Sequence, residues 1–154
     1  MLPKLVRVEG PIHLDYAFKR LNKAIGLKPA LPSFHEAYRT VVEDMVGKGH
    51  FQRSGEFLWH DEGRAVKVRV PSQGIEALVR PIKYIPSEEI QAAMLHILEH
   101  SMSLSRRSLI QETANIFRAR QTPKTNRILA IELARMLNKQ IVTEVGEILS
   151  LANQ

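Results

Sequence analysis

The stretch "KGHFQRSGEFLWH" at residues 48–60 and the stretch "KQIVTEVGEILSL" at residues 139–151 follow one pattern. Each has a short run of apolar character, then a Gly-Glu pair, then an apolar tail, which is typical of a two-stranded β-hairpin that turns at the glycine. Each also follows an amphipathic segment that is predicted to be helical. The repetition predicts two copies of one unit, with helices first and a hairpin last.

Length and composition are those of an ordinary globular protein. The 154 residues are 44% apolar and 25% charged, which suffices for one compact domain or two small ones. No apolar run approaches the roughly 18 residues of a membrane-spanning helix, and the N-terminus lacks the pattern of a signal peptide. We therefore expect a cytoplasmic protein with no membrane partner. Cysteine is absent, which excludes disulfides, thiolate zinc sites and cysteine nucleophiles.

The second copy is the more complete one. Helices are expected over 87–100, from a cap at Ser105 onward, and over 126–138 with Thr125 as the cap. Pro123 separates the last two helices, because proline cannot continue a helix. Apolar residues at helical spacing predict the core of this copy: Ile90, Ala93, Met94, Ile97, Leu98, Leu109, Ile110, Ala114, Phe117, Leu129, Leu133, Met136 and Leu137.

The first copy follows the same order with a shortened beginning. Its first helix is about half as long as its counterpart, and the second is expected over 15–25. Ser33 and Glu36 form a capping box at the start of the third helix. Because the chain begins at once with core residues, we expect a C-terminal fragment of a longer protein. The inward stripe of the third helix is predicted to be Phe34, Tyr38, Val41, Val42 and Met45.

These elements predict a mainly α fold with small β-hairpins, in the α+β class. The arrangement is a tandem winged-helix repeat, in which each unit has a helix-turn-helix followed by a β wing. The expected boundaries are residues 1–62 for the first unit and 85–154 for the second. Units of this size bury only about 60% of their unfolded surface, so we expect them to pack on one another. Trp59, at the end of the first wing, is the residue expected to pack between them.

Residues 63–84 are expected to connect the two units. Val66, Val68 and Val70 alternate with charged residues there. This spacing predicts one exposed edge strand in place of a flexible linker.

Three further runs carry a resemblance to a known family: "VEGPIHLDYAFKRL" at 8–21, "GEFLW" at 55–59 and "YIPSEEIQAAMLHILE" at 84–99. The chain resembles the C-terminal domain-of-unknown-function family 3320 over nearly its whole length, and departs from it at 118–127. That family lies at the ends of large bacterial proteins that resemble superfamily I DNA helicases, often beside an endonuclease-like domain. The resemblance implies a bacterial accessory domain whose partners include the rest of its parent chain, with no catalytic residues of its own.

No motif predicts an enzyme. The chain has no GxxxxGK[ST] loop and no G-x-S-x-G, so nucleotide hydrolysis and serine hydrolase chemistry are not indicated. His96 to His100 spells H-x-x-E-H, in which two histidines one helical turn apart bind zinc and Glu99 is the base. The alternative is a pair of solvent-facing histidines, because both fall beside or opposite the core stripe. We predict no catalytic residues, no metal and no cofactor.

The third helix of a helix-turn-helix enters the major groove of DNA, so its outer face decides the partner. In the first copy that face carries Glu36, Thr40, Glu43 and Gly47, with Asp44 beside them. An acidic face repels phosphate, so we expect it to pack against protein. The second copy has seven basic residues between positions 106 and 135 and only two acidic ones. They predict DNA binding through phosphates, with low sequence specificity: Arg106, Arg107, Arg118, Arg120, Lys124, Arg127 and Arg135.

Two alternatives remain open. The basic cluster can be a solvated face, since a net charge of +6 permits an anionic partner without requiring one. Ile131 lies outward on the third helix, where it contacts a thymine methyl group or is covered by a protein partner. The second class of function is therefore a winged-helix module for protein interaction or homodimerisation, without direct nucleic-acid binding.

Overall fold

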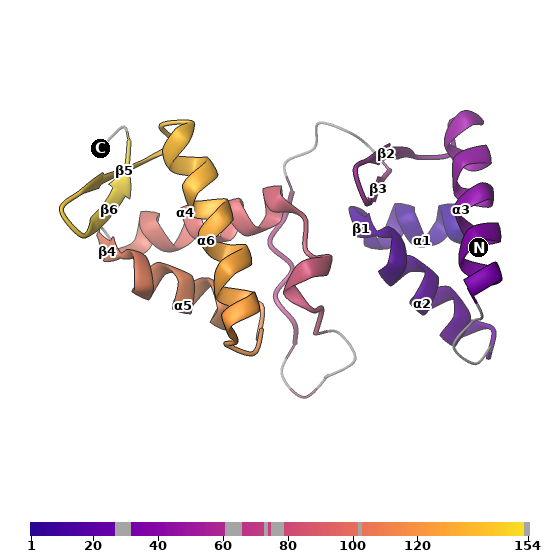
Figure 1. Ribbon diagram of the computed structural model, residues 1–154, viewed down its shortest axis with the longest axis horizontal. Coiled ribbons are helices and arrows are strands. Elements are labelled where there is room, and N and C mark those ends of the chain that lie inside the picture. The colour runs from indigo at the N-terminus through magenta and orange to yellow at the C-terminus, as the bar shows by residue number, and fades with distance from the viewer. Residues whose placement is uncertain (27–31, 61–65, 73, 75–78, 102, 153–154) are drawn as a thin grey trace. The chain divides into compact units, whose positions relative to one another are not determined.

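The chain forms two compact units, divided between Ala65 and Val66. The computed structural model describes residues 1–26, 32–60, 66–72, 74, 79–101 and 103–152. Both units are mainly helical, and each carries a small antiparallel sheet (Figure 1). The mainly α, α+β class predicted from the sequence is therefore confirmed.

The first unit begins with a short helix and ends with a hairpin. The central strand of its sheet is β3, with β1 on one side and β2 on the other. Leu58 of β3 lies opposite Ile12 of β1 and opposite Arg53 of β2, and the hairpin turns at Gly55 with φ of 56°. The elements are α1 (Leu2–Glu9), β1 (Ile12–His13), α2 (Leu14–Ala24), α3 (Pro32–Gly47), β2 (Gln52–Ser54) and β3 (Phe57–Trp59).

The second unit repeats this order after a 3-10 turn. Its central strand is β6, between β4 and β5, and its hairpin turns at Gly146 with φ of 65°. The hairpin lies at one end of the unit, beside β4 (Figure 1). The elements are η2 (Ile82–Tyr84), α4 (Ser87–Ser101), β4 (Leu104–Ser105), α5 (Arg106–Ile116), α6 (Pro123–Asn138), β5 (Val142–Val145) and β6 (Ile148–Leu151). As expected, α1 is the shorter first helix, with 8 residues against 15 in α4.

Local sequence explains where α5 and α6 begin. Ser105 caps α5, as predicted, because its hydroxyl accepts the N–H of Ser108 at 3.1 Å. The predicted start of the third helix was wrong: α6 begins at Pro123, and Thr122 is its cap, accepting the N–H of Thr125 at 3.1 Å. Proline suits the first position of a helix, where its missing N–H has no partner to lose and its φ is already helical.

The core predicted for the second unit is largely confirmed, whereas the core predicted for the third helix of the first unit is partly wrong. Most of the predicted core positions of α4, α5 and α6 are buried, and Ile110 and Leu137 are half-buried against the same cluster. In α3, however, Phe34 is 53% exposed and Val41 is 46% exposed. The buried side of α3 is centred on Val42, with Tyr38 and Met45 at the i−4 and i+3 positions.

The connecting segment differs from its prediction. Residues 66–72 form no strand, although an edge strand was expected over 66–70. The backbone N–H of Arg69 donates to Oε1 of Glu89 at 2.9 Å, so a side chain takes the donor that a neighbouring strand would have used. The described part of the connection belongs to the compact second unit. The expected boundary at residues 62–63 lies outside the described residues.

Candidate nucleic-acid interface

All seven basic residues predicted to bind DNA are exposed, but they do not form one cluster. Arg106 and Arg107 lie in the first turn of α5, and Arg118 follows the last turn of the same helix. Four of the seven lie close together in the chain, at the α5–α6 turn and the start of α6. We call these four residues the turn cluster: Arg118, Arg120, Lys124 and Arg127.

Two of the remaining basic residues are held by carboxylates. The guanidinium of Arg106 donates to both carboxylate oxygens of Glu144 in β5, and these bonds lower the pKa of the Glu144 carboxyl. Arg135 donates to Oε1 of Glu132 at 2.8 Å and to the hydroxyl of Ser87 at 3.1 Å. Both charges are therefore offset within the protein, which weakens their attraction for phosphate.

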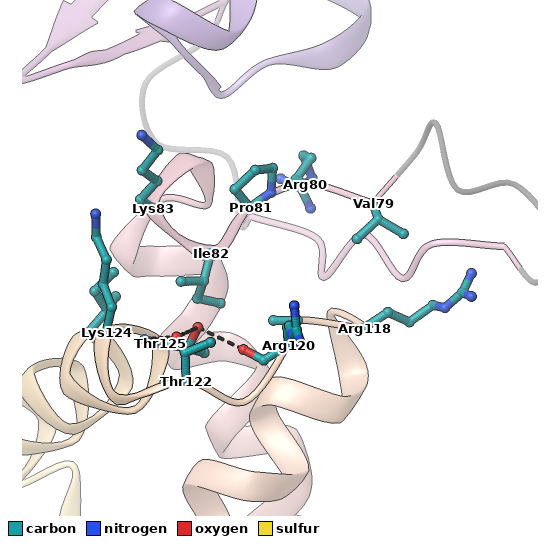
Figure 2. A pocket seen from close by; sticks show the side chains of 12 residues that line it. Val79, Arg80, Pro81, Ile82, Lys83, Arg118, Arg120, Thr122, Lys124 and Thr125 are labelled. Atoms are coloured by element: carbon teal, nitrogen blue, oxygen red, sulfur yellow. Dashed lines mark hydrogen bonds between the residues drawn. The ribbon is translucent and has the colours of Figure 1, made fainter.

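Hydrogen bonds fix the shape of the α5–α6 turn. Arg118 has a left-handed backbone with φ of 51°, and its guanidinium donates to the carbonyl oxygen of Ser72 at 3.2 Å. The hydroxyl of Thr125 donates to the carbonyl oxygen of Arg120 at 2.9 Å. These two bonds fix the turn, from which the side chains of Arg118 and Lys124 extend on opposite sides of Arg120 (Figure 2).

A second segment adds two basic residues beside the turn cluster. Residues 79–83 and residues 118–125 line a cavity of about 410 Å³, to which Ile128 of α6 also contributes. Figure 2 shows that the side chains of Lys83 and Lys124 extend in the same direction beside this cavity. Five lining residues are basic and none of the described lining residues is acidic: Arg80, Lys83, Arg118, Arg120 and Lys124.

The sequence analysis missed Arg80 and Lys83. Both precede α4, about forty residues from the turn cluster along the chain. Helical periodicity shows which residues share one helix face and does not show which distant segments come into contact. The run Arg80-Pro81-Ile82-Lys83 has two basic residues, separated by two apolar ones, as its signal. Only the packing of η2 against the start of α6 brings them to the cavity.

Glu89 is a buried charge of the second unit. It lies in the first turn of α4, where a carboxylate suits the helix dipole, and its side chain is 0% exposed. Arg69 donates to Oε2 at 2.6 Å and Arg80 donates to Oε1 at 2.6 Å. Burial alone would raise the pKa of Glu89, but the bonds from Arg80 and Arg69 outweigh it, so the pKa lies below its ordinary value.

The two residues predicted to lie at protein interfaces differ in exposure. Ile131 is 45% exposed and lies on α6 between Arg127 and Arg135 in the chain. Trp59 in β3 is buried, and its indole nitrogen has no hydrogen-bond partner among the described residues. Packing of Trp59 between the units stays a prediction.

The acidic face predicted on the first unit is present. Glu36, Glu43 and Asp44 are exposed on α3. Arg53 of β2 contacts Glu43, and Lys48 donates to Asp44 at 2.6 Å. Arg53 and Lys48 are therefore engaged by carboxylates of this face.

The H-x-x-E-H residues lie together on the surface of α4. The side chains of His96, Glu99 and His100 are exposed, and their ligand atoms lie within 4.8 Å of one another. Nδ1 of His100 lies 2.8 Å from the carbonyl oxygen of His96. All three residues come from one helix face that is open to solvent, so water has free access to them.

Comparisons with known proteins add no relative: no family model, curated protein or solved structure matches the chain. Among the residues that the structure describes, no helix is both long enough and apolar enough to cross a bilayer.

Proposed function

We propose that the chain is a tandem winged-helix repeat. Two features of the fold support this reading. Both units have the order helix, strand, helix, helix, hairpin, and in both the last strand lies between the other two. In such a unit α6 is the recognition helix and the β5–β6 hairpin is the wing.

The second unit is proposed to bind DNA through its phosphates. The observation that carries this proposal is the turn cluster itself. Arg120, Lys124 and Arg127 are exposed at the start of the proposed recognition helix, and none has an ion pair among the described residues. Such cations bind phosphates of any sequence, so the contact positions the protein without reading bases.

The biological role rests on the family resemblance. A non-catalytic domain that holds DNA without sequence preference would position a larger helicase-like or nuclease-like protein on its substrate. The first unit, with its acidic α3 face, is proposed to contact protein, including the rest of the parent chain. DNA and the parent chain are therefore the two partners we propose.

Fluorescence anisotropy of the 154-residue chain on labelled duplex, single-stranded and forked DNA over a salt series tests this function. Three or four phosphate contacts predict a slope of about −3 for the logarithm of affinity against the logarithm of salt. Absence of binding at low salt would refute the proposal and make the turn cluster a solvated face.

The exposure of Ile131 favours one other function, a surface for protein interaction or homodimerisation. An isoleucine 45% exposed in the middle of α6 is available to a partner. Size-exclusion chromatography with light scattering at two concentrations separates the two readings. A dimer that Ile131→Glu dissociates would support the interaction module, and a monomer at both concentrations would favour DNA binding alone.

A further inference from the structure

The cavity beside the turn cluster has two kinds of wall. Its volume of about 410 Å³ lies within the range of roughly 300–1,000 Å³ that small-molecule sites occupy. The non-polar lining residues come from both segments that form it, and they are Val79, Pro81, Ile82, Ala119 and Ile128. The five basic side chains lie around this apolar wall. A ligand suited to both needs a weakly polar body that carries negative charge.

The basic residues of the lining are not equivalent. Arg80 is engaged by the buried carboxylate of Glu89, and Arg118 donates to the carbonyl oxygen of Ser72. Lys83, Arg120 and Lys124 have no ion pair among the described residues. The Nζ atom of Lys83 lies 4.7 Å from the ring centroid of Tyr84, which holds the amino group near the η2 segment without neutralising it. These three cations are therefore the ones available to an anion.

A nucleotide has the required chemistry. Its base is planar and packs on apolar groups or on a guanidinium plane, and its phosphate binds lysine and arginine. A base that is paired and stacked in a duplex cannot enter a cavity, so the nucleotide must be unpaired. The position of the cavity beside the start of α6 places it next to the proposed DNA contacts.

We propose that this cavity binds one unpaired nucleotide, with the base against Ile82, Ala119 and Ile128 and the phosphate among Lys83, Arg120 and Lys124. The inference rests on the proposed DNA binding of the second unit, which it deepens by naming an unpaired strand end as the preferred substrate. A free nucleoside monophosphate has the same chemistry, and the experiment below includes it as a separate arm.

The first arm compares a blunt duplex with the same duplex carrying a three-nucleotide overhang, by anisotropy at fixed salt. The wild-type chain should bind the overhang duplex roughly fivefold more tightly or better, since one stacked base contributes at least that factor. Ala119→Phe fills the cavity, and Lys83→Gln removes a cation from the proposed phosphate site. Both variants should lose the preference, which is read as the ratio of the two affinities and therefore does not depend on any loss of affinity for the blunt duplex.

Lys83 is exposed, so Lys83→Gln keeps the test valid if Ala119→Phe fails to fold. Equal affinities of the wild-type chain for the two duplexes would overturn the inference while leaving the proposed DNA binding intact. The inference would also be overturned if folded Ala119→Phe and Lys83→Gln both still bound the overhang duplex more tightly than the blunt duplex.

The second arm is independent of duplex binding. Thymidine monophosphate at millimolar concentration should shift the amide resonances of Ala119 and Ile128 in the wild-type chain and not in Ala119→Phe. If no DNA binds but the nucleotide does, the DNA function fails and the cavity site stands. If neither binds, the site is refuted. Shifts of the same size from inorganic phosphate would show an anion site only and would overturn the placement of the base.

Discussion

Nη2 of Arg80 lies 2.6 Å from Oε1 of Glu89, a carboxylate whose side chain is closed to solvent. Arg69 donates to the other oxygen of the same carboxylate, so one buried negative charge pairs with two arginines. Arg69 precedes Glu89 by twenty residues and Arg80 precedes it by nine. The contact therefore fastens two parts of the connecting segment to α4.

Glu89→Gln should destabilise the second unit by about 3 kcal/mol. Removing one partner of a buried ion pair costs about 3–5 kcal/mol, and the low end applies because Arg69 keeps some contact with water. Urea unfolding followed by far-UV circular dichroism measures the change. Glu88→Gln alters the exposed neighbouring residue and should stay within about 0.5 kcal/mol of wild type. Equal free energies of unfolding for Glu89→Gln and Glu88→Gln would contradict a stabilising role of the buried Glu89 carboxylate.

Stability should depend on Glu89 at acid pH. Its pKa is lower in the folded chain than in the unfolded chain, so the unfolded state binds a proton first as the pH falls. The ionised Glu89 carboxylate therefore stabilises the fold fully at neutral pH. This stabilisation is lost as the pH drops below about 4 toward the pKa of Glu89 in the folded chain. Thermal melts between pH 7 and pH 3 should fall more steeply for wild type than for Glu89→Gln. Parallel curves would exclude Glu89 as a source of acid sensitivity.

Reversing two charges of the turn cluster should weaken binding to every DNA sequence alike. The double variant Lys124→Glu and Arg127→Glu removes two cations and should flatten the log–log salt slope by about 2. The matched control is Lys4→Glu with Arg7→Glu, an exposed pair at the same i, i+3 spacing on α1. Equal losses in the two double variants would point to net charge and not to the turn cluster.

Freeing Arg106 should strengthen DNA binding. Glu144→Gln removes the carboxylate that holds Arg106 and should raise affinity roughly threefold at low salt, because one more cation becomes available to phosphate. Glu147→Gln removes a negative charge from the same hairpin, but Glu147 has no ion pair among the described residues. A role of Glu144 in holding Arg106 away from phosphate requires a larger gain in DNA affinity for Glu144→Gln than for Glu147→Gln.

The second hairpin should depend on glycine at its turn. Gly146 has φ of 65°, a left-handed backbone that costs about 1 kcal/mol for a residue with a Cβ atom. Gly146→Ala should therefore lower the free energy of unfolding by about that amount, measured by urea titration. Gly47→Ala places alanine at the helical end of α3, with no atom near the added Cβ, and should be neutral or stabilising. An unchanged free energy of unfolding for Gly146→Ala would show that the hairpin turn accommodates a Cβ atom without strain.

Much of the helical core of the second unit could be predicted, because helix periodicity and capping are local properties of the sequence. Ser105 and the buried residues of α4 illustrate this. The predicted stripe of α3 was partly wrong, since Phe34 and Val41 are apolar but exposed, whereas Val42 is buried. Pro123 was read as a stop between helices although it is the first residue of one.

The cavity and the buried carboxylate could not be predicted, because they depend on contacts between distant parts of the chain. Glu89 looked like an ordinary first-turn acid, and nothing local distinguishes it from exposed Glu88. Likewise, Lys83 gains its position only when η2 lies against α6.

The bond from the backbone N–H of Arg69 to Glu89 also bears on aggregation. Residues 66–70 have the valine-rich alternation of a sequence that can add to the sheet of another molecule. A β partner would need that N–H, and the carboxylate already occupies it. Glu89 should therefore hinder intermolecular strand addition at this segment, and a variant that loses it should self-associate more readily.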